Sequence, residues 1–125
     1  MIKGLHHIAI ICSDKQKSLA FYVDALGFKV VRTHVRPEHH DEIIMLEGYG
    51  VVLELFADNT HPPRVTNPEA LGLRHLALWV CDVEALSKSL LTHGFCPEQI
   101  RRDSFTNDKM TFVKDPDGLP IELHE

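Results

Sequence analysis

Apolar positions along the chain form short strand-like runs and helical stripes, and they follow one another in the same order twice. Each time, one strand-like run precedes a stripe of apolar residues at helical spacing, and three further strand-like runs follow. The pattern therefore predicts two βαβββ modules. The expected strands are Leu5–Cys12, Phe28–Val35, Glu42–Glu47 and Val51–Ala57 in the first module, and Leu73–Val80, Glu98–Asp103, Lys109–Lys114 and Leu119–His124 in the second.

Each expected helix lies between the first two strands of its module and has recognisable end signals. Asp14 and Asp82 stand where an N-cap residue belongs, and Gly27 and Gly94 stand where a C′ glycine belongs. We expect about three turns in the first helix, an ordinary length. The apolar stripes that support the two helices are Leu19, Tyr22, Ala25 and Leu26, and then Val83, Leu86 and Leu90.

The segment between the modules has a different composition. Asp58–Leu71 contains three prolines and has no apolar period, so we interpret it as a linker. A chain of 125 residues can build one domain with its own core. We therefore expect a single α+β domain over residues 1–125, with one module at about 1–57, the linker at about 58–71 and the other module at about 72–125.

The two modules repeat one another at an offset of 68 residues (75 − 7). The phrase Gly4-Leu5-His6-His7-Ile8-Ala9 returns as Gly72-Leu73-Arg74-His75-Leu76-Ala77, and Gly50-Val51-Val52-Leu53-Glu54-Leu55 returns as Gly118-Leu119-Pro120-Ile121-Glu122-Leu123. Such self-similarity indicates an internal duplication. Each copy keeps one strand histidine and one strand glutamate, 47 residues apart (54 − 7 and 122 − 75).

Strand alternation places these residues on the face opposite the aliphatic one. Leu53 and Leu55 point away from Glu54, and their repeat equivalents point away from Glu122. A helix covers the aliphatic face, so the His and Glu side chains belong to the other, concave face. A pseudo-twofold relation between the modules would bring His7, Glu54, His75 and Glu122 together.

Two carboxylates and two imidazoles in a largely apolar cavity indicate a cation. A buried carboxylate without a partner is costly or takes up a proton. This donor set suits one divalent ion per chain: Ni, Zn, Mn, Co or Fe. A single histidine on an apolar strand is more often a satisfied core residue than a ligand, and only the repetition of the pattern favours the metal. The strand that carries Glu122 also contains Pro120, which predicts an edge or irregular strand.

Composition narrows the remaining choices. The net charge is −5 without a basic block, which argues against nucleic acid as a partner, and no apolar run approaches a membrane span. The N-terminus has no signal-peptide layout. The three cysteines, Cys12, Cys81 and Cys96, lack CxxC spacing, so we expect reduced core thiols in a cytoplasmic protein. The nine histidines raise the expectation of metal binding.

With these features the whole chain resembles the vicinal oxygen chelate superfamily, which includes glyoxalase I, bleomycin resistance proteins and extradiol dioxygenases. It looks closest to small bacterial glyoxalase-like proteins. The resemblance rests on His-x-Ala-x₄-Asp from His7, on Phe21-Tyr22 and Leu26-Gly27-Phe28, and on the ending Asp115-Pro116-Asp117-Gly118-Leu119-Pro120-Ile121-Glu122. It implies paired βαβββ modules that form a curved mixed sheet around a metal. The glyoxalase I ligand pattern falls on His7, Glu54, His75 and Glu122.

The resemblance implies a metal-dependent lyase or isomerase that abstracts a proton next to a carbonyl. The metal would stabilise the enediolate as a Lewis acid, with Glu122 favoured as the base and Glu54 as its partner. Bacterial glyoxalase I has an arginine that helps to hold glutathione four residues after its first histidine ligand. Here that position is Ile11, repeated as Trp79. These residues and Phe56 predict an apolar pocket wall, which argues against glutathione.

Two other classes of function stay open from the sequence. An Fe(II)-dependent extradiol-type dioxygenase needs two histidines and one carboxylate. A non-catalytic small-molecule binding or resistance protein usually needs no metal set. Arg74 and Lys114 are candidate substrate anchors, although exposure at the surface is the commoner outcome for basic residues. We expect a homodimer that binds a small-molecule substrate, and the linker is compatible with ligands from one chain or from two.

Overall fold

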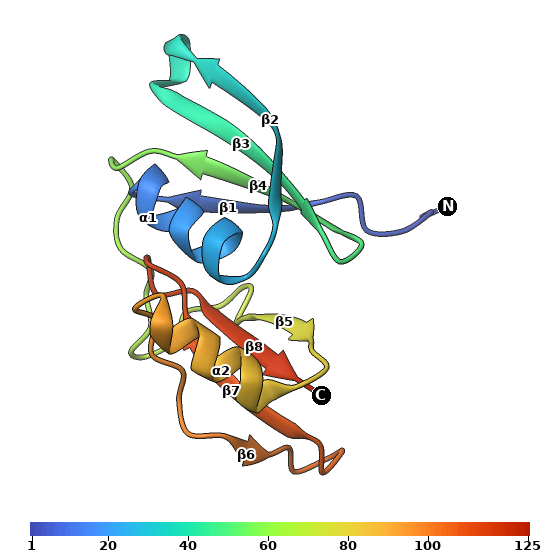
Figure 1. Cartoon of the computed structure of the whole chain (residues 1–125). Coiled ribbons are helices and arrows are strands. Elements are labelled where there is room, and N and C mark those ends of the chain that lie inside the picture. Colours follow the sequence, from blue (N-terminus) through green and yellow to red (C-terminus); the bar gives the residue numbers. More distant parts are fainter. The chain divides into compact units, whose positions relative to one another are not determined.

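The computed structural model describes residues 1–125 and contains the two βαβββ modules that the sequence predicts (Figure 1). The chain divides into two compact units, Met1–Pro62 and Pro63–Glu125. Each unit carries one four-stranded mixed sheet with a helix against it. The predicted α+β fold class is confirmed.

The first unit has the strand order β1-β4-β3-β2. Strand β1 runs parallel to β4, and the other neighbours are antiparallel, so the last strand of the unit lies between the first and the third. In chain order the elements are β1 (Ile8–Cys12), α1 (Lys15–Leu19), the π-helix η1 (Ala20–Ala25), β2 (Lys29–Arg36), the short 3₁₀ turn η2 (Pro37–His39), β3 (Asp41–Gly48) and β4 (Val51–Ala57).

The second unit has the corresponding order β5-β8-β7-β6. Strand β5 is parallel to β8, which is antiparallel to β7. The elements are β5 (Leu76–Trp79), α2 (Val83–Thr92), β6 (Arg101–Arg102), β7 (Lys109–Lys114) and β8 (Pro120–His124). The segment expected to be a linker, 58–71, contains neither helix nor strand and has a single bridge between Thr66 and Glu69.

The duplication extends to the register of the paired strands. Ala9 is the partner of Glu54 in the β1–β4 pair, and Ala77 is the partner of Glu122 in the β5–β8 pair. Ala77 and Glu122 lie 68 residues after Ala9 and Glu54, respectively (77 − 9 and 122 − 54). Because a one-residue slip would exchange the two faces of a strand, the shared register puts both glutamates on equivalent faces.

The helices cover the aliphatic face of each sheet, as alternation predicts. Asp14 and Asp82 cap them, with Oδ1 accepting from the backbone N–H of Lys17 at 3.1 Å and of Ala85 at 2.8 Å. No helix has the length and apolar content that crossing a bilayer requires. The buried side chains of the helices and of the strands that they cover include Ile10, Cys12, Tyr22, Ile44, Leu46, Leu53 and Leu55 in the first unit and Val83, Leu90, Val113, Ile121 and Leu123 in the second.

The first helix differs from its expected form in its second half. The 15–19 stretch is α-helical, but Ala20–Ala25 is a π-helix. This wider turn occurs where Phe21 and Tyr22, neighbours in sequence, are both fully buried and pack edge to face at 4.9 Å between ring centroids. The apolar period predicted the element but not the wider turn.

Strand β8 corrects one expectation, because it is not an edge strand. It lies between β5 and β7. Pro120 is its first residue and pairs in register with Lys114, at the end of the ladder, where a missing N–H costs least. The carboxylate of Glu122 therefore projects from the interior of a regular sheet.

Two further expectations need correction. The strand expected over Glu98–Asp103 is reduced to Arg101–Arg102, because the chain before it contacts β7 irregularly: the Glu98 N–H donates to the Phe112 carbonyl at 2.8 Å. Of the three cysteines only Cys12 is buried. Cys81 lies between β5 and α2 and Cys96 in the loop after α2, where both are exposed.

Candidate functional site

Each unit brings its repeated histidine and glutamate into contact on the face that its helix leaves uncovered. His7 Nε2 lies 3.4 Å from Glu54 Oε2, and His75 Nε2 lies 2.9 Å from Glu122 Oε2. The four residues that the sequence predicts as metal ligands thus come together as two pairs. We refer to them as the first pair (His7–Glu54) and the second pair (His75–Glu122).

The strand arrangement explains how each pair forms. In both units the histidine directly precedes the first strand: His7 stands before β1 and His75 before β5. The glutamate lies in the middle of the neighbouring parallel strand, flanked on both sides by other strands. The Glu side chains are accordingly less exposed, at 18% and 12%, than the His side chains, at 36% and 26%. Each glutamate is thus fixed by a central strand, and the more exposed imidazole contacts its carboxylate.

The spacing within both pairs fits two ligands of one metal ion. Bonds of about 2.1 Å with angles between 90° and 109° place neighbouring ligand atoms roughly 3.0–3.4 Å apart. The separation of 3.4 Å in the first pair lies at the upper end of that range, and the separation of 2.9 Å in the second pair lies just below its lower end. Imidazole nitrogen and carboxylate oxygen are also the donors that first-row divalent ions accept. The residues present therefore fit the metal that the donor pattern predicts.

The second ring nitrogens of the two histidines have different neighbours. His7 Nδ1 lies 2.8 Å from His6 Nδ1, and donation from His7 leaves the Nε2 lone pair free toward Glu54. His75 Nδ1 lies 3.4 Å from Arg74 Nη1, a donor, so His75 Nε2 carries the proton and donates to Glu122. Coordination by His75 Nε2 requires the other tautomer, with Arg74 bonded only to its second partner, Glu69.

A third histidine lies beside the second pair, and the sequence did not single it out. His124 Nε2 is 4.0 Å from Glu122 Oε1 and 3.8 Å from Asp103 Oδ2. Its Nδ1 donates to the Glu125 carbonyl at 2.8 Å, which fixes the ring. Strand alternation could have identified His124 as a site residue, because it is two residues from Glu122 and therefore lies on the same face of the strand. A search for residues repeated in both units misses His124, because the equivalent position in the first unit is Phe56 (124 − 68).

Asp103 completes this cluster from the loop after β6. Backbone N–H groups of Thr106 and Phe105 donate to Asp103 Oδ1 and lower the pKa of its carboxyl group. The ionised carboxylate turns its other oxygen toward His124. Asp103, Glu122 and His124 place ligand atoms within 4.8 Å of one another, which makes them a second set of potential metal donors next to His75.

The three apolar residues expected to line a pocket lie on the same faces as the pairs. Ile11 is the register partner of Phe56 in the first unit, and Trp79 is the partner of His124 in the second. Ile11 is 52% exposed and Trp79 is 91% exposed. The guanidinium of Arg36 lies over the Phe56 ring at 5.2 Å and is bonded to Asp41, whose pKa it lowers. That these residues contact a substrate stays a prediction.

Comparison with known proteins gives matches over nearly the whole chain. The family model described as "Glyoxalase/Bleomycin resistance protein/Dioxygenase superfamily" matches residues 4–123. The uncharacterized protein YwkD of Bacillus subtilis is 46% identical, covering 100% of this chain and 98% of its own. A lactoylglutathione lyase of Salmonella typhimurium is 32% identical, covering 97% and 91%.

Solved structures match in the same way. The crystal structure of a glyoxalase family protein from Enterococcus faecalis has a TM-score of 0.93 at 47% identity and covers 98% of both chains. A mutant of the fosfomycin resistance protein FosX from Listeria monocytogenes, solved with Mn(II) and a dihydroxypropylphosphonic acid, has a TM-score of 0.77 at 19% identity, with 99% and 93% coverage. The latter likeness shows the fold alone.

Proposed function

Because the chain belongs to the glyoxalase/bleomycin resistance protein/dioxygenase superfamily, we propose that it is a metal-dependent lyase or isomerase of the glyoxalase type, which removes a proton next to a carbonyl group. The observation that carries this proposal is the His–Glu pair, made twice at the spacing of metal ligands. The superfamily is largely one of enzymes, and a relative at 32% identity is a lactoylglutathione lyase. The more similar YwkD is uncharacterized, so no substrate is carried over.

In this proposal His7, Glu54, His75 and Glu122 hold one divalent ion of Ni, Zn, Mn, Co or Fe per chain. When bound, the ion would supply Lewis acidity that stabilises negative charge on the substrate oxygens. The structure of FosX with Mn(II) supports divalent metal chemistry on this fold. The proposed unit of function is a single domain over residues 1–125, in a homodimer in the cytoplasm.

Glu122 is the proposed base. Its Oε2 lies 2.9 Å from His75 Nε2, the other proposed ligand of the second pair, while Oε1 has no partner nearer than His124 at 4.0 Å. Oε1 is therefore the atom proposed to take the proton from the substrate carbon. Glu54 is proposed as the partner carboxylate. Ile11, Phe56 and Trp79 provide apolar walls, which suit a substrate without the peptide of glutathione.

A second candidate function is favoured by the cluster around Glu122. His75 and His124 both face this carboxylate, at 2.9 and 4.0 Å. Two histidines and one carboxylate with open positions are the ligand set of non-haem Fe(II) oxygenases. An extradiol-type dioxygenase is therefore the alternative against which the lyase should be tested.

The first test is the metal content. The purified protein would be reconstituted separately with Ni²⁺, Mn²⁺, Zn²⁺ and Fe²⁺, freed of excess ion and analysed for elements. We expect one ion per chain in the wild type and loss of most of it in His75→Ala. His93→Ala is the matched control, because His93 lies at the end of α2 and bonds to the Ser89 carbonyl. A wild-type protein that retains none of these ions would refute the proposal.

Oxygen consumption separates the two candidates. The Fe²⁺-reconstituted protein would be given catechol in an oxygen electrode. A dioxygenase consumes oxygen, and His124→Ala abolishes that activity if His124 is a ligand. The lyase proposal predicts no consumption and retention of the ion in His124→Ala.

A further inference from the structure

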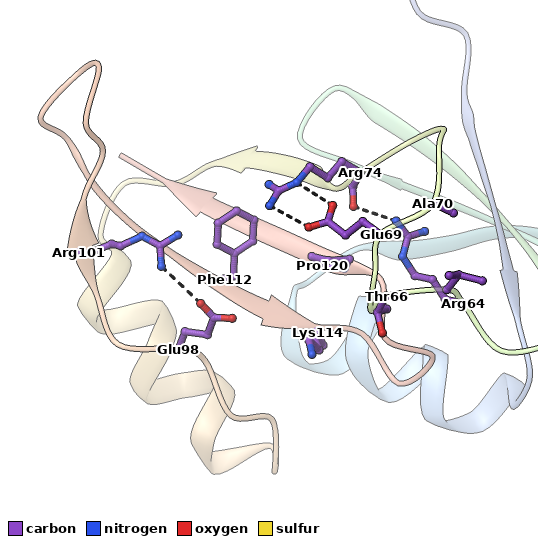
Figure 2. A pocket seen from close by; sticks show the side chains of 11 residues that line it. Arg64, Thr66, Glu69, Ala70, Arg74, Glu98, Arg101, Phe112, Lys114 and Pro120 are labelled. Atoms are coloured by element: carbon purple, nitrogen blue, oxygen red, sulfur yellow. Dashed lines mark hydrogen bonds and ion pairs between the residues drawn. The ribbon is translucent and has the colours of Figure 1, made fainter.

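The second unit contains a cavity of about 240 Å³ next to the second pair (Figure 2). Residues from three parts of the unit line it: the segment before β5, the stretch around β6, and the paired ends of β7 and β8. Among the charged residues of this lining, basic side chains outnumber acidic ones. The charged and aromatic members are Arg64, Glu69, Arg74, Glu98, Arg101, Phe112 and Lys114.

Phe112 connects this cavity to the proposed catalytic carboxylate. It is the register partner of Glu122, so both side chains project from the same face of the sheet. Its ring packs edge to face against the His75 ring, with centroids 5.2 Å apart. Lys114 is two residues further along the same strand, and therefore roughly 7 Å from Phe112 on that face. A molecule of a few bonds' length can span from Glu122 to Lys114.

The charge of the cavity is opposite to that of the chain. Four cations and two carboxylates line it, a balance of two positive charges in a chain whose net charge is −5. Arg74 bonds to Glu69 at 2.9 and 3.2 Å, and Arg101 lies 3.5 Å from Glu98. These four side chains are all more than half exposed. Exposed pairs of this kind contribute little to stability, so an incoming anion can displace their carboxylates.

Two of the cations are placed to bind a ligand. The Arg101 guanidinium stacks over the Phe112 ring at 5.6 Å, which holds its fork of donors above the strand. Lys114 is exposed and has no ion-pair partner. In Figure 2 the guanidinium groups of Arg101 and Arg74 lie on either side of the Phe112 ring.

We propose that this cavity binds the anionic group of the substrate, a carboxylate or a phosphate on a small α-hydroxycarbonyl compound. Arg101 and Lys114 bind the oxyanion, and Phe112 packs against the carbon chain that leads to the reacting carbon beside Glu122. The placement of that carbon rests on the proposed function. The anion subsite itself rests on the cavity, its charge and its register with Glu122.

Binding to matched probes tests the subsite. Calorimetry would compare dihydroxyacetone phosphate with neutral dihydroxyacetone, and 5-hydroxy-4-oxopentanoate would serve as the carboxylate probe of similar length. We expect at least one of the two anionic probes to bind roughly tenfold or more tightly than dihydroxyacetone. Hydrogen bonds to charged groups predict a further loss of roughly tenfold to a hundredfold for the anions in Arg101→Gln and Lys114→Gln. The better of the two anionic probes identifies the head group.

Lys88→Gln is the matched control, because it removes one positive charge from the exposed side of α2, away from the cavity. It should leave both affinities within about twofold of the wild type. Equal binding of the anionic and neutral probes would overturn the subsite, and so would equal anion affinities in wild type, Arg101→Gln and Lys114→Gln.

Repeating the titrations without metal separates this proposal from the proposed function. Anion preference that persists in the metal-free protein supports the subsite, even if reconstitution shows that no ion binds. Metal binding without anion preference retains the proposed function and refutes the subsite. Anion preference that appears only with the ion and is unchanged in Lys114→Gln assigns the oxyanion to the ion and also refutes the subsite.

Discussion

Two glycines that end equivalent helices offer a test of the structure in which one serves as the control for the other. Gly27 follows the first helix with φ +83°, and Gly94 follows α2 with φ +85°. Alanine at either position must adopt the left-handed conformation, at a cost of about 1–2 kcal/mol. The surroundings differ. A Cβ on Gly94 would meet nothing within 4 Å, whereas a Cβ on Gly27 would lie 2.6 Å from the Tyr49 hydroxyl oxygen.

The contacts of Tyr49 set the size of the difference. Its hydroxyl donates to the Leu26 carbonyl at 2.7 Å, and its ring packs edge to face on Phe28 at 5.4 Å. Displacing the ring forfeits a hydrogen bond worth about 0.5–1.5 kcal/mol and an aromatic contact worth about as much. We therefore expect Gly94→Ala to destabilise by about 1–2 kcal/mol and Gly27→Ala by about 2–5 kcal/mol.

Equilibrium unfolding in urea, followed by circular dichroism, measures both free energies. Tyr49→Phe adds a check, because it removes the oxygen that the new Cβ would meet. The cost of Gly27→Ala should be smaller in the Tyr49→Phe background than in the wild type. If Gly27→Ala is no more destabilising than Gly94→Ala, the tight approach of Tyr49 to the helix end is wrong.

The remaining predictions concern the site, acid stability and assembly. Glu122→Gln should fold, retain measurable metal and lose turnover by roughly 10²–10⁴-fold on any α-hydroxycarbonyl substrate found; wild-type turnover in this variant together with loss in Glu54→Gln would reverse the two roles. The Lys109 ammonium donates to Glu84 at 2.7 Å and lowers the pKa of that carboxyl group. The stability from this pair is present above the unfolded-state pKa of about 4.3 and is lost as the pH falls through the lower folded value. Glu84→Gln should therefore show a smaller drop in melting temperature between neutral pH and about pH 3, and an unchanged drop would contradict this assignment. Light scattering at micromolar concentration should give the mass of a homodimer, and a monomer mass would exclude it.

The sequence predicted what the duplication preserves. A 68-residue offset keeps strands, caps and alternation in step, so the two His–Glu contacts and their faces could be derived from His7, Glu54, His75 and Glu122 alone. Alternation also predicted correctly which face the helices cover. The same reasoning passed over His124, because its counterpart Phe56 is apolar and a search for repeated residues ignores unmatched positions.

Features that depend on the path of irregular backbone segments could not be predicted from the sequence pattern. Pro120 suggested an edge strand, yet its position as the first residue of β8 leaves the rest of the ladder intact. Arg64, Arg101 and Lys114 line one cavity because the segment before β5 and the stretch around β6 meet at the same part of the sheet. No local periodicity predicts such a meeting, since it depends on tertiary contacts between irregular segments.

The place of the last strand in each sheet has a consequence for how metal would be acquired. Strands β4 and β8 come last in their units, yet each inserts between two earlier strands and carries the glutamate. Neither pair can therefore form during synthesis until the final strand of its unit has been made and inserted. An ion held by both donors of a pair is therefore captured only after the last strand of that unit has been synthesised. Metal retention would thus report completed folding, and a chain truncated before Pro120 would lose the second pair together with the centre of its sheet.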